Sequence, residues 1–218
     1  MKYCIFLFVT LLIVSCTEPN VYHPRSNWSF LVTKSTDSIV DTLTLEILDK
    51  PWQITQQKME WVLNVYHADK SRTEAIIQTG VSDHDLSFPV SLFKKDVISL
   101  PSPPAIEYMK YVRLLPPPQI QYPVAIGNSI DWKKKVQSGS QEFAGVEVTG
   151  RVRVKDKIYF SNQTLSDSCW VLESYGKSSA GVFKGIYYFS EKYGFIYFKY
   201  DFKDYWVEIV PYEVIMYK

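Results

Sequence analysis

The sequence predicts an all-β protein, an antiparallel sheet that forms an open or half-barrel in a single domain, with at most a short helix. Three observations support this prediction. Apolar and polar residues alternate with a period of two over most of the chain after residue 28. Aromatic residues, which favour strands, make up 16% of the chain. Turn-forming residues separate about ten short apolar runs, which is typical of antiparallel barrels and sandwiches.

Alternation predicts the strands of the first half of the chain, which are 28–33, 40–48, 59–66, 74–78 and 97–100. In the second of these, Leu43, Leu45 and Ile47 face one way and the intervening polar residues face the other. We expect that strand to end at Asp49–Pro51. A helix over 53–63 is an alternative, because Gln, Lys, Met and Glu favour helices.

The Pro-rich stretch from Pro101 to Pro123 contains one further predicted strand, 108–115. Prolines that bracket a strand are expected at sheet edges, where a missing N–H costs little. We therefore favour one continuous domain over 28–218. An interdomain linker near 101–123, dividing two domains, is the alternative.

The C-terminal third shows the clearest alternation, and its predicted strands are 145–154, 158–160, 168–173, 185–189, 195–200, 205–210 and 214–217. We expect a turn at Lys155–Lys157 and another at Ser190–Gly194. Gly194 suits the second turn, since glycine adopts positive φ without a steric penalty.

The chain has 218 residues and a mass of 25.3 kDa, with a formal net charge of +1. A charge this close to zero argues against a general nucleic-acid binder. An apolar content of 46% argues against a disordered chain. Three cysteines cannot build a disulfide framework.

Residues 1–15 read as a signal peptide, with Lys2 before a short apolar run. That run falls below the roughly 20 residues that a transmembrane helix needs. It ends in Ile13-Val14-Ser15-Cys16, which resembles a bacterial lipobox, so we expect lipidation of Cys16. An ordinary cleaved signal peptide is the alternative. Cleavage before Cys16 would leave a polar, lipidated tether over 16–27 and Cys169 as the single free thiol.

These features predict a lipid-anchored protein of the bacterial cell envelope. Thr17 differs from the Asp that retains proteobacterial lipoproteins at the inner membrane, which favours the outer membrane. Surface-exported lipoproteins of the Bacteroidota usually carry an acidic cluster after the cysteine. Here Glu18 stands alone, so the sequence leaves the leaflet open.

Four segments carry a resemblance to a family type, and they are the lipobox, Pro123–Gly127, Cys169–Glu173 and Tyr187–Ile196. Together they resemble uncharacterised exported lipoproteins of the Bacteroidota, most clearly over residues 100–218. By analogy, the resemblance implies an open, incomplete β-barrel like those of lipoprotein-handling factors. A shared fold carries no function of its own.

Signals for catalysis or for a metal site are weak. None of the common motifs of hydrolases, metalloproteases or nucleotide-binding enzymes occurs. Asp83-His84-Asp85 reads as a solvated loop, since adjacent residues of a strand point to opposite faces. Cys169 next to Trp170 reads as a small core residue, because a nucleophile would need a nearby base. We therefore predict no catalytic residue, no metal and no cofactor.

Aromatic residues near the C-terminus are the best candidates for a binding face, and the six that we single out are Tyr187, Tyr188, Tyr197, Tyr200, Tyr205 and Trp206. Tyr and Trp combine an apolar body with a polar tip, which suits ligand or partner binding. A two-sided core with cross-strand ring pairs is the structural alternative.

The leading hypothesis is a non-enzymatic envelope lipoprotein that binds an apolar or amphipathic ligand, such as a lipid, or a protein partner on this aromatic face. An accessory glycan-binding lipoprotein of a nutrient-uptake system is the alternative, because the same rings can stack on sugars. A hydrolase is the remote alternative, and it would require a cluster of carboxylates or the convergence of His67, His84 and Cys169.

Overall fold

The computed structural model describes residues 22–36, 38–53, 56–82, 97–105, 107–136 and 142–216. The predictions for the signal peptide (1–15), for Cys16 and for Asp83–Asp85 lie outside these ranges. Within them, no helix is both long and apolar enough to cross a membrane. The elements are β1 (Asn27–Lys34), β2 (Asp41–Gln53), β3 (Gln56–Tyr66), β4 (Arg72–Ser82), β5 (Val97–Ser99), the 3-10 helix η1 (Glu107–Leu114), β6 (Gln119–Gln121), β7 (Ser129–Lys135), β8 (Glu147–Ser161), β9 (Ser166–Ser178), β10 (Gly181–Ser190), β11 (Gly194–Phe202) and β12 (Tyr205–Ile215).

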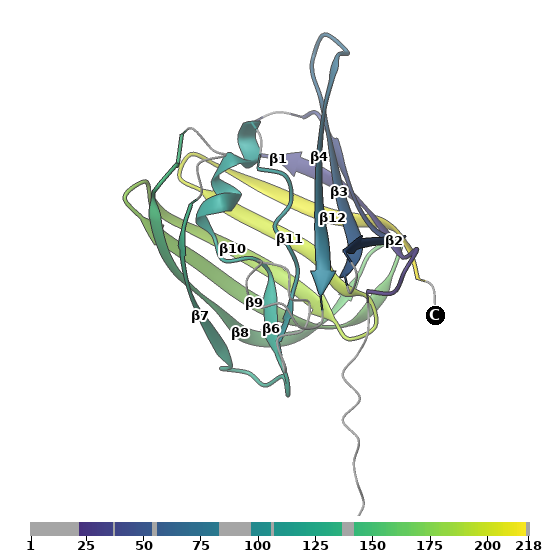
Figure 1. Ribbon diagram of the computed structural model, residues 1–218, viewed down its shortest axis with the longest axis vertical. Coiled ribbons are helices and arrows are strands. Elements are labelled where there is room, and N and C mark those ends of the chain that lie inside the picture. The colour runs from purple at the N-terminus through teal and green to yellow at the C-terminus, as the bar shows by residue number, and fades with distance from the viewer. Residues whose placement is uncertain are drawn as a thin grey trace, which may run out of the picture.

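In the described ranges, ten strands form one curved antiparallel sheet in the order β4-β3-β2-β1-β12-β11-β10-β9-β8-β7. β1 lies between β2 and β12, so the first strand pairs with the last and joins the two halves of the chain. The edge strands β4 and β7 do not pair with each other, and the sheet stays open (Figure 1). The predicted all-β fold, an open antiparallel sheet in a single domain, is confirmed.

The Pro-rich stretch packs against one face of this sheet, where η1 and β6 lie in front of the strands (Figure 1). We call residues 97–105 and 107–122 the inner plug, the face that they cover the inner face, and the opposite one the outer face. Buried plug residues that join the main hydrophobic core are Ile98, Leu100, Met109, Val112, Leu114, Leu115 and Ile120. The plug therefore belongs to the same domain as the sheet and is not an interdomain linker.

Hydrogen bonds from sheet side chains fix the inner plug in place. Three side chains donate to plug carbonyls, namely Tyr187 to Pro116 (3.1 Å), Trp61 to Pro101 (3.1 Å) and Tyr205 to Tyr108 (2.5 Å). In return, the Tyr108 hydroxyl donates to the buried Asp41 carboxylate at 2.5 Å. Because a lost bond would leave a buried polar group unsatisfied, these contacts specify one position for the plug.

The strand predicted over 108–115 is wrong, because these residues are largely the 3-10 helix η1. Met109 and Val112 of η1 and Leu115 directly after it recur every three residues and are all buried. A spacing of three matches the 3.0 residues per turn of a 3-10 helix, so one side of η1 faces the core. The prolines on both sides bracket a helix that fills the concave sheet, and not an edge strand.

Two glycines let the plug backbone approach the sheet closely. Gly150 of β8 and Gly176 of β9 pair directly across the ladder. A Cβ atom on Gly176 would overlap the Leu114 carbonyl, and one on Gly150 would lie 2.8 Å from the Cγ of Pro116. The pair thus forms a side-chain-free patch at the point where the plug leaves η1.

Three strands are longer than predicted, because bulges replace the expected breaks. β2 continues through Asp49–Pro51 with shifts in its register against β3. β8 continues through Lys155–Lys157, with a bulge between Val154 and Asp156. β12 joins the two strands predicted over 205–210 and 214–217. A bulge adds a residue and bends the strand without ending it.

Two further differences concern elements that the alternation pattern does not separate. The alternative helix over 53–63 is wrong in the described part of that range, which belongs to β2 and β3. β7 was not predicted, because Asp131 and Lys133–Lys135 make it resemble a polar loop. Lysines on an edge strand oppose pairing with another sheet, which accounts for this composition.

Candidate functional site

The six aromatic candidates divide between the two faces of the sheet. Tyr187 and Tyr200 are fully buried in the main core of the inner face. Tyr205 points to the same face and bonds to the inner plug. Tyr188, Tyr197 and Trp206 lie on the outer face, following the alternation of β10, β11 and β12. The structure therefore does not bring all six into one surface.

On the outer face, Tyr188 and Tyr197 form a small second core. Their rings stack with centroids 4.3 Å apart, and Phe160 packs edge-on against Tyr188. The Tyr197 hydroxyl donates to Glu208 at 2.5 Å. Burial and this neighbouring carboxylate raise the pKa of Tyr197 well above its usual value. Tyr188 and Tyr197 thus contribute to packing and are not available to bind a ligand.

The tip of the β8–β9 hairpin covers this outer cluster. Asn162 donates to the carbonyl of Pro211, and Thr164 donates to that of Tyr212, each at 2.8 Å. The hairpin tip is thereby held against the end of β12. Leu165 at the tip packs with Cys169 and with Ile196.

Cys169 is fully buried in this cluster, and it has no histidine beside it in the described structure. Burial, with a smaller effect of the Asp167 carboxylate, raises the pKa of the Cys169 thiol from 9.0 to about 12. His67 lies in the turn between β3 and β4, at the other end of the sheet, and bonds to Thr73. His84 lies outside the described residues.

Beside this cluster, the outer face presents a ladder of alternating charges and rings. The register places Arg151, Tyr175, Lys184, Asp201 and Trp206 side by side on five neighbouring strands, from β8 to β12. Tyr175 is 45% exposed and Trp206 is 36% exposed. Strands lie about 4.8 Å apart, so these two rings stand about 14 Å apart across the ladder.

A second row runs parallel to the first, one step closer to the Tyr188–Tyr197 pair. It places Arg153, Glu173, Ile186, Lys199 and Glu208 on the same five strands. Both rows carry acidic, basic and apolar side chains. The outer face of β8–β12 is thus amphipathic, with no single sign of charge.

A groove of about 370 Å³ lies over these two rows. The side chains that line this outer groove are Glu173, Tyr175, Val182, Lys184, Ile186, Lys199 and Asp201. The ammonium group of Lys199 stands 5.0 Å from the ring centroid of Trp206, which places Trp206 at the border of the groove. Lys184 and Asp201 face each other across the ladder without forming an ion pair in the described structure. Their charged groups are therefore free to meet a ligand.

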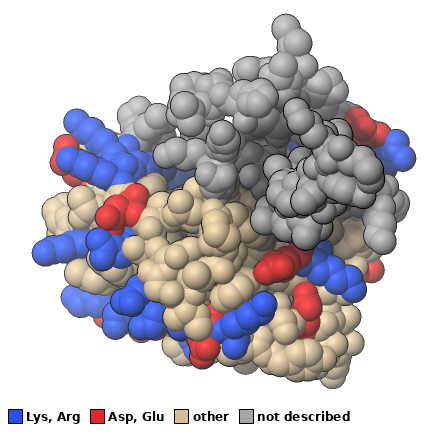
Figure 2. All heavy atoms as spheres, turned by 90° about the horizontal axis from the view of Figure 1, so that it is seen from below, with Lys and Arg blue, Asp and Glu red and all other residues tan. Residues whose placement is uncertain are grey.

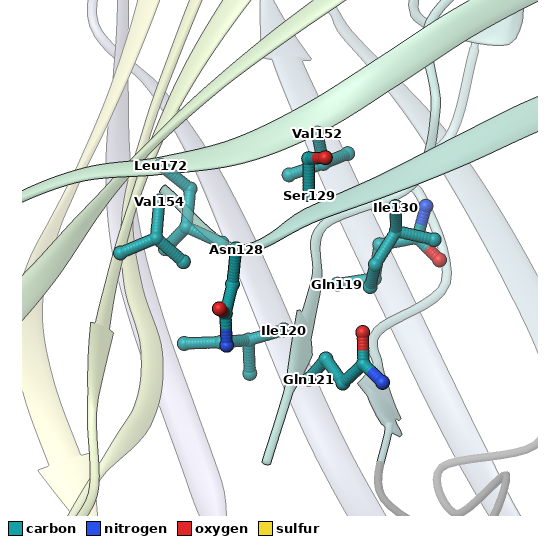
Figure 3. A pocket seen from close by; sticks show the side chains of 9 residues that line it. All are labelled: Gln119, Ile120, Gln121, Asn128, Ser129, Ile130, Val152, Val154 and Leu172. Atoms are coloured by element: carbon teal, nitrogen blue, oxygen red, sulfur yellow. The ribbon is translucent and has the colours of Figure 1, made fainter. Parts of the chain in front are cut away.

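The inner face offers a much smaller space. A pocket between β6 and the β7–β8 edge is lined by residues such as Gln119, Ile120 and Val154 (Figure 3). Its volume of about 10 Å³ has room for about one water molecule. The amide nitrogen of Gln119 has no hydrogen-bond partner among the described residues, and such a water would satisfy it. The pocket cannot admit an apolar ligand.

No group of three His, Cys, Asp or Glu side chains in the described ranges could hold a metal ion. The carboxylates of the outer groove come from different strands and alternate with lysines. The chemistry available on this face is therefore hydrogen bonding, ion pairing and ring stacking.

None of the side chains that line the outer groove was among the six predicted aromatic candidates. Of those six, Trp206 lies at the border of the groove. Tyr175, Lys184 and Asp201 came together because a register of five strands aligned them. Apolar alternation did not mark Tyr175, since its neighbours Ser174 and Gly176 are not apolar although both are buried. The register itself could not be read from the sequence.

No protein-family model matches the chain, and no curated protein matches it. Two solved structures match this chain over most of its length. A "putative lipoprotein" of Parabacteroides distasonis shares 11% identity over 89% of this chain and 96% of its own, with a TM-score of 0.41. A "putative exported protein with YmcC-like fold" of Bacteroides fragilis shares 8% identity over 88% and 96%, with a TM-score of 0.46. At these values, neither likeness contributes to the assignment of a function.

Proposed function

We propose that the protein is a non-enzymatic lipoprotein of the bacterial cell envelope, anchored through Cys16, that binds an oligosaccharide in its outer groove. The observation that carries the ligand class is that two exposed rings, Tyr175 in the groove and Trp206 at its border, have charged side chains between them. Sugars present both apolar C–H faces and hydroxyl groups. Rings stack on the former, and carboxylates and ammonium groups hydrogen-bond to the latter.

The dimensions of the groove support a short oligosaccharide. Its volume of about 370 Å³ falls in the usual range for small-molecule sites. The two rings bracket Lys184 and Asp201 at a separation of about 14 Å, so a ligand of several sugar units could reach both. Asp201 provides an acceptor and the two lysines provide donors within this span, while Glu173 is in an ion pair with Lys155 at 3.2 Å.

An apolar ligand, the first hypothesis from the sequence, has less support. In the described residues, the inner plug occupies the concave face of the sheet, and the pocket left there measures about 10 Å³. The outer rings Tyr188 and Tyr197 are packed beneath the β8–β9 hairpin. The outer groove, which is open to a ligand, is amphipathic.

The proposal is tested by retention of cell-envelope extract on the immobilised, detergent-solubilised lipoprotein. The extract comes from the bacterium that encodes the protein and is divided into portions treated with periodate, which cleaves sugar diols, or with proteinase K. We expect retained material that survives proteinase and is lost after periodate. Retention that is lost with proteinase alone would identify a protein partner and would contradict the oligosaccharide proposal, as would no retention.

A further inference from the structure

The first described residue, Tyr22, is fixed to one end of the sheet. Its side chain is 4% exposed, and its hydroxyl accepts a hydrogen bond of 2.9 Å from the backbone N–H of Phe195. A Cβ on Gly194 would lie 2.6 Å from that hydroxyl, so the glycine in the β10–β11 turn makes room for the ring. The Tyr22 ring also packs on Trp28, with centroids 5.2 Å apart. The first described residue is thus held at this turn.

The distance from Tyr22 to the proposed anchor is short. Six residue steps separate it from Cys16. A fully extended chain spans at most about 3.5 Å per residue, so the acylated cysteine lies within about 20 Å of Tyr22. Acyl chains on Cys16 would hold its backbone at the level of the lipid headgroups. The tether then keeps the end of the sheet where Tyr22 docks within about 20 Å of the bilayer surface.

We call this end the anchor end, which comprises the β10–β11 turn, the β8–β9 hairpin tip, the β6–β7 connection and the end of β12. Large apolar side chains are exposed there, with exposed fractions of 70% for Tyr159, 63% for Ile126, 44% for Tyr212 and 42% for Ile215. Lys157 stands over the Trp170 ring, and Lys192 over the Tyr193 ring. Aromatic rings combined with lysines are typical of surfaces that sit at the membrane interface.

Charges of both signs share the anchor end. Arg25 pairs with Asp49, and the lysines of the hairpin and turn have Asp156 and Glu191 as sequence neighbours. Figure 2 looks onto the molecule from below, toward this end, and shows neutral residues over much of the described surface, with Lys and Arg around its margins next to Asp and Glu. Attraction to anionic lipid is therefore a smaller contribution here than insertion of the rings, and a neutral bilayer should suffice.

We propose that the anchor end lies against the lipid surface, with Tyr159 and Tyr212 at headgroup level, an inference that rests on lipidation of Cys16. The outer groove then stands above the bilayer surface. Lys184 lies six residues along β10 from Ser190 at the turn, a rise of about 20 Å at 3.3 Å per residue. The anchor thus holds the groove in the aqueous phase, where a polar ligand can reach it.

The test uses the full lipidated protein in phosphatidylcholine vesicles. A Cys169→Ala background removes the remaining thiol, and a fluorophore is attached to a single new cysteine, either Tyr159→Cys or Tyr212→Cys at the anchor end. Ser179→Cys is the matched control, because it lies in the exposed turn between β9 and β10 at the opposite end. We expect a headgroup-level quencher lipid to quench the anchor-end labels at least threefold more than the control.

Equal quenching at both ends, or stronger quenching at Ser179→Cys, would overturn the orientation. Mass spectrometry of Cys16 on the same samples separates the two claims. An acylated Cys16 with the wrong quenching pattern overturns the orientation alone. An unmodified Cys16 overturns both the orientation and the lipoprotein proposal.

Discussion

At the scale of single residues, burial decides which side chains can react or bind. Cys169 is the clearest case, because its thiol lies under the β8–β9 hairpin with Leu165 and Ile196. The residue is a small core hydrophobe, as the neighbouring Trp170 suggested from the sequence. Tyr187 and Tyr200 are likewise fully buried, on the inner face of the sheet.

Native Cys169 should resist alkylation by iodoacetamide at pH 8. Its pKa of about 12, against 9.0 for an ordinary thiol, leaves about a thousandfold less thiolate in the folded protein. The same reaction in guanidinium chloride provides the control, since unfolding exposes the thiol. Cys169→Ala should cost about 1 kcal/mol of stability and leave oligosaccharide binding unchanged. Rapid native alkylation, or loss of binding in a folded Cys169→Ala variant, would contradict this account.

At the scale of elements, the inner plug is the feature that turns an open sheet into a stable domain. It brings η1 and the β5–β6 pair against the concave face and bonds to Tyr187, Trp61 and Tyr205. Its backbone approaches the strands closely at Gly176, beneath the Leu114 carbonyl. The fit at this point should therefore control the stability of the whole domain.

Gly176→Ala should destabilise the protein by about 3 kcal/mol, at the upper end of the range for overpacked cores. The new methyl group meets a backbone carbonyl of the plug, which cannot rotate away as a side chain could. Lys177→Ala, the next residue of β9 with an exposed side chain, is the matched control and should change stability little. Chemical denaturation compares the two variants, and equal midpoints would show that the plug does not seat on this glycine.

The elements also show how far alternation predicts structure. It located strands that are rich in apolar residues, such as 28–33 and 195–200, because their side chains are largely buried, those of 195–200 on both faces of the sheet. It failed for 108–115, where spacings of two and three are both present and the shape of the concave face selects a helix. It missed β7, whose charges suit an edge strand as well as a loop. Bulges in β2 and β8 were missed because they change register without changing composition.

At the scale of the whole molecule, the buried tyrosines make the stability of the fold depend on pH. Burial raises the pKa of Tyr22, Tyr187 and Tyr200 above the ordinary value of 10.0. Below pH 10, both the folded and the unfolded chain keep these phenol protons, and the full stability is present. Above pH 10, the unfolded chain loses them first, so the free energy of unfolding falls as pH rises.

Each buried tyrosine should remove about 1.4 kcal/mol of stability per pH unit above pH 10, until the pH reaches its raised folded pKa. Denaturation in guanidinium chloride at pH 7, 8.5 and 11 measures this loss. Tyr200→Phe should reduce the slope and keep the fold, because the Tyr200 hydroxyl has no hydrogen-bond partner among the described residues. Stability that stays constant from pH 8.5 to pH 11 would contradict this assignment of the core.

The candidate site was only partly predictable, because it depends on the strand register of the whole sheet. Aromatic content pointed to the C-terminal strands, and Trp206 does border the outer groove. Tyr175 and Lys184 line the same groove because of the strand register, and that register depends on every turn and bulge between the strands. Their approach is a property of the folded sheet, and local sequence patterns do not encode it.

The central claim is that the outer groove binds an oligosaccharide between its two rings. The most direct measurement is the dissociation constant of the periodate-sensitive envelope fraction, by titration calorimetry, for the native protein, Trp206→Ala and Tyr66→Ala. Tyr66 is 37% exposed, close to Trp206 at 36%, but lies on β3 far from the groove. We predict that Trp206→Ala weakens binding at least about tenfold, equivalent to about 1.4 kcal/mol, and that Tyr66→Ala leaves it unchanged. Unchanged affinity in a folded Trp206→Ala variant, or equal losses in both variants, would contradict the claim.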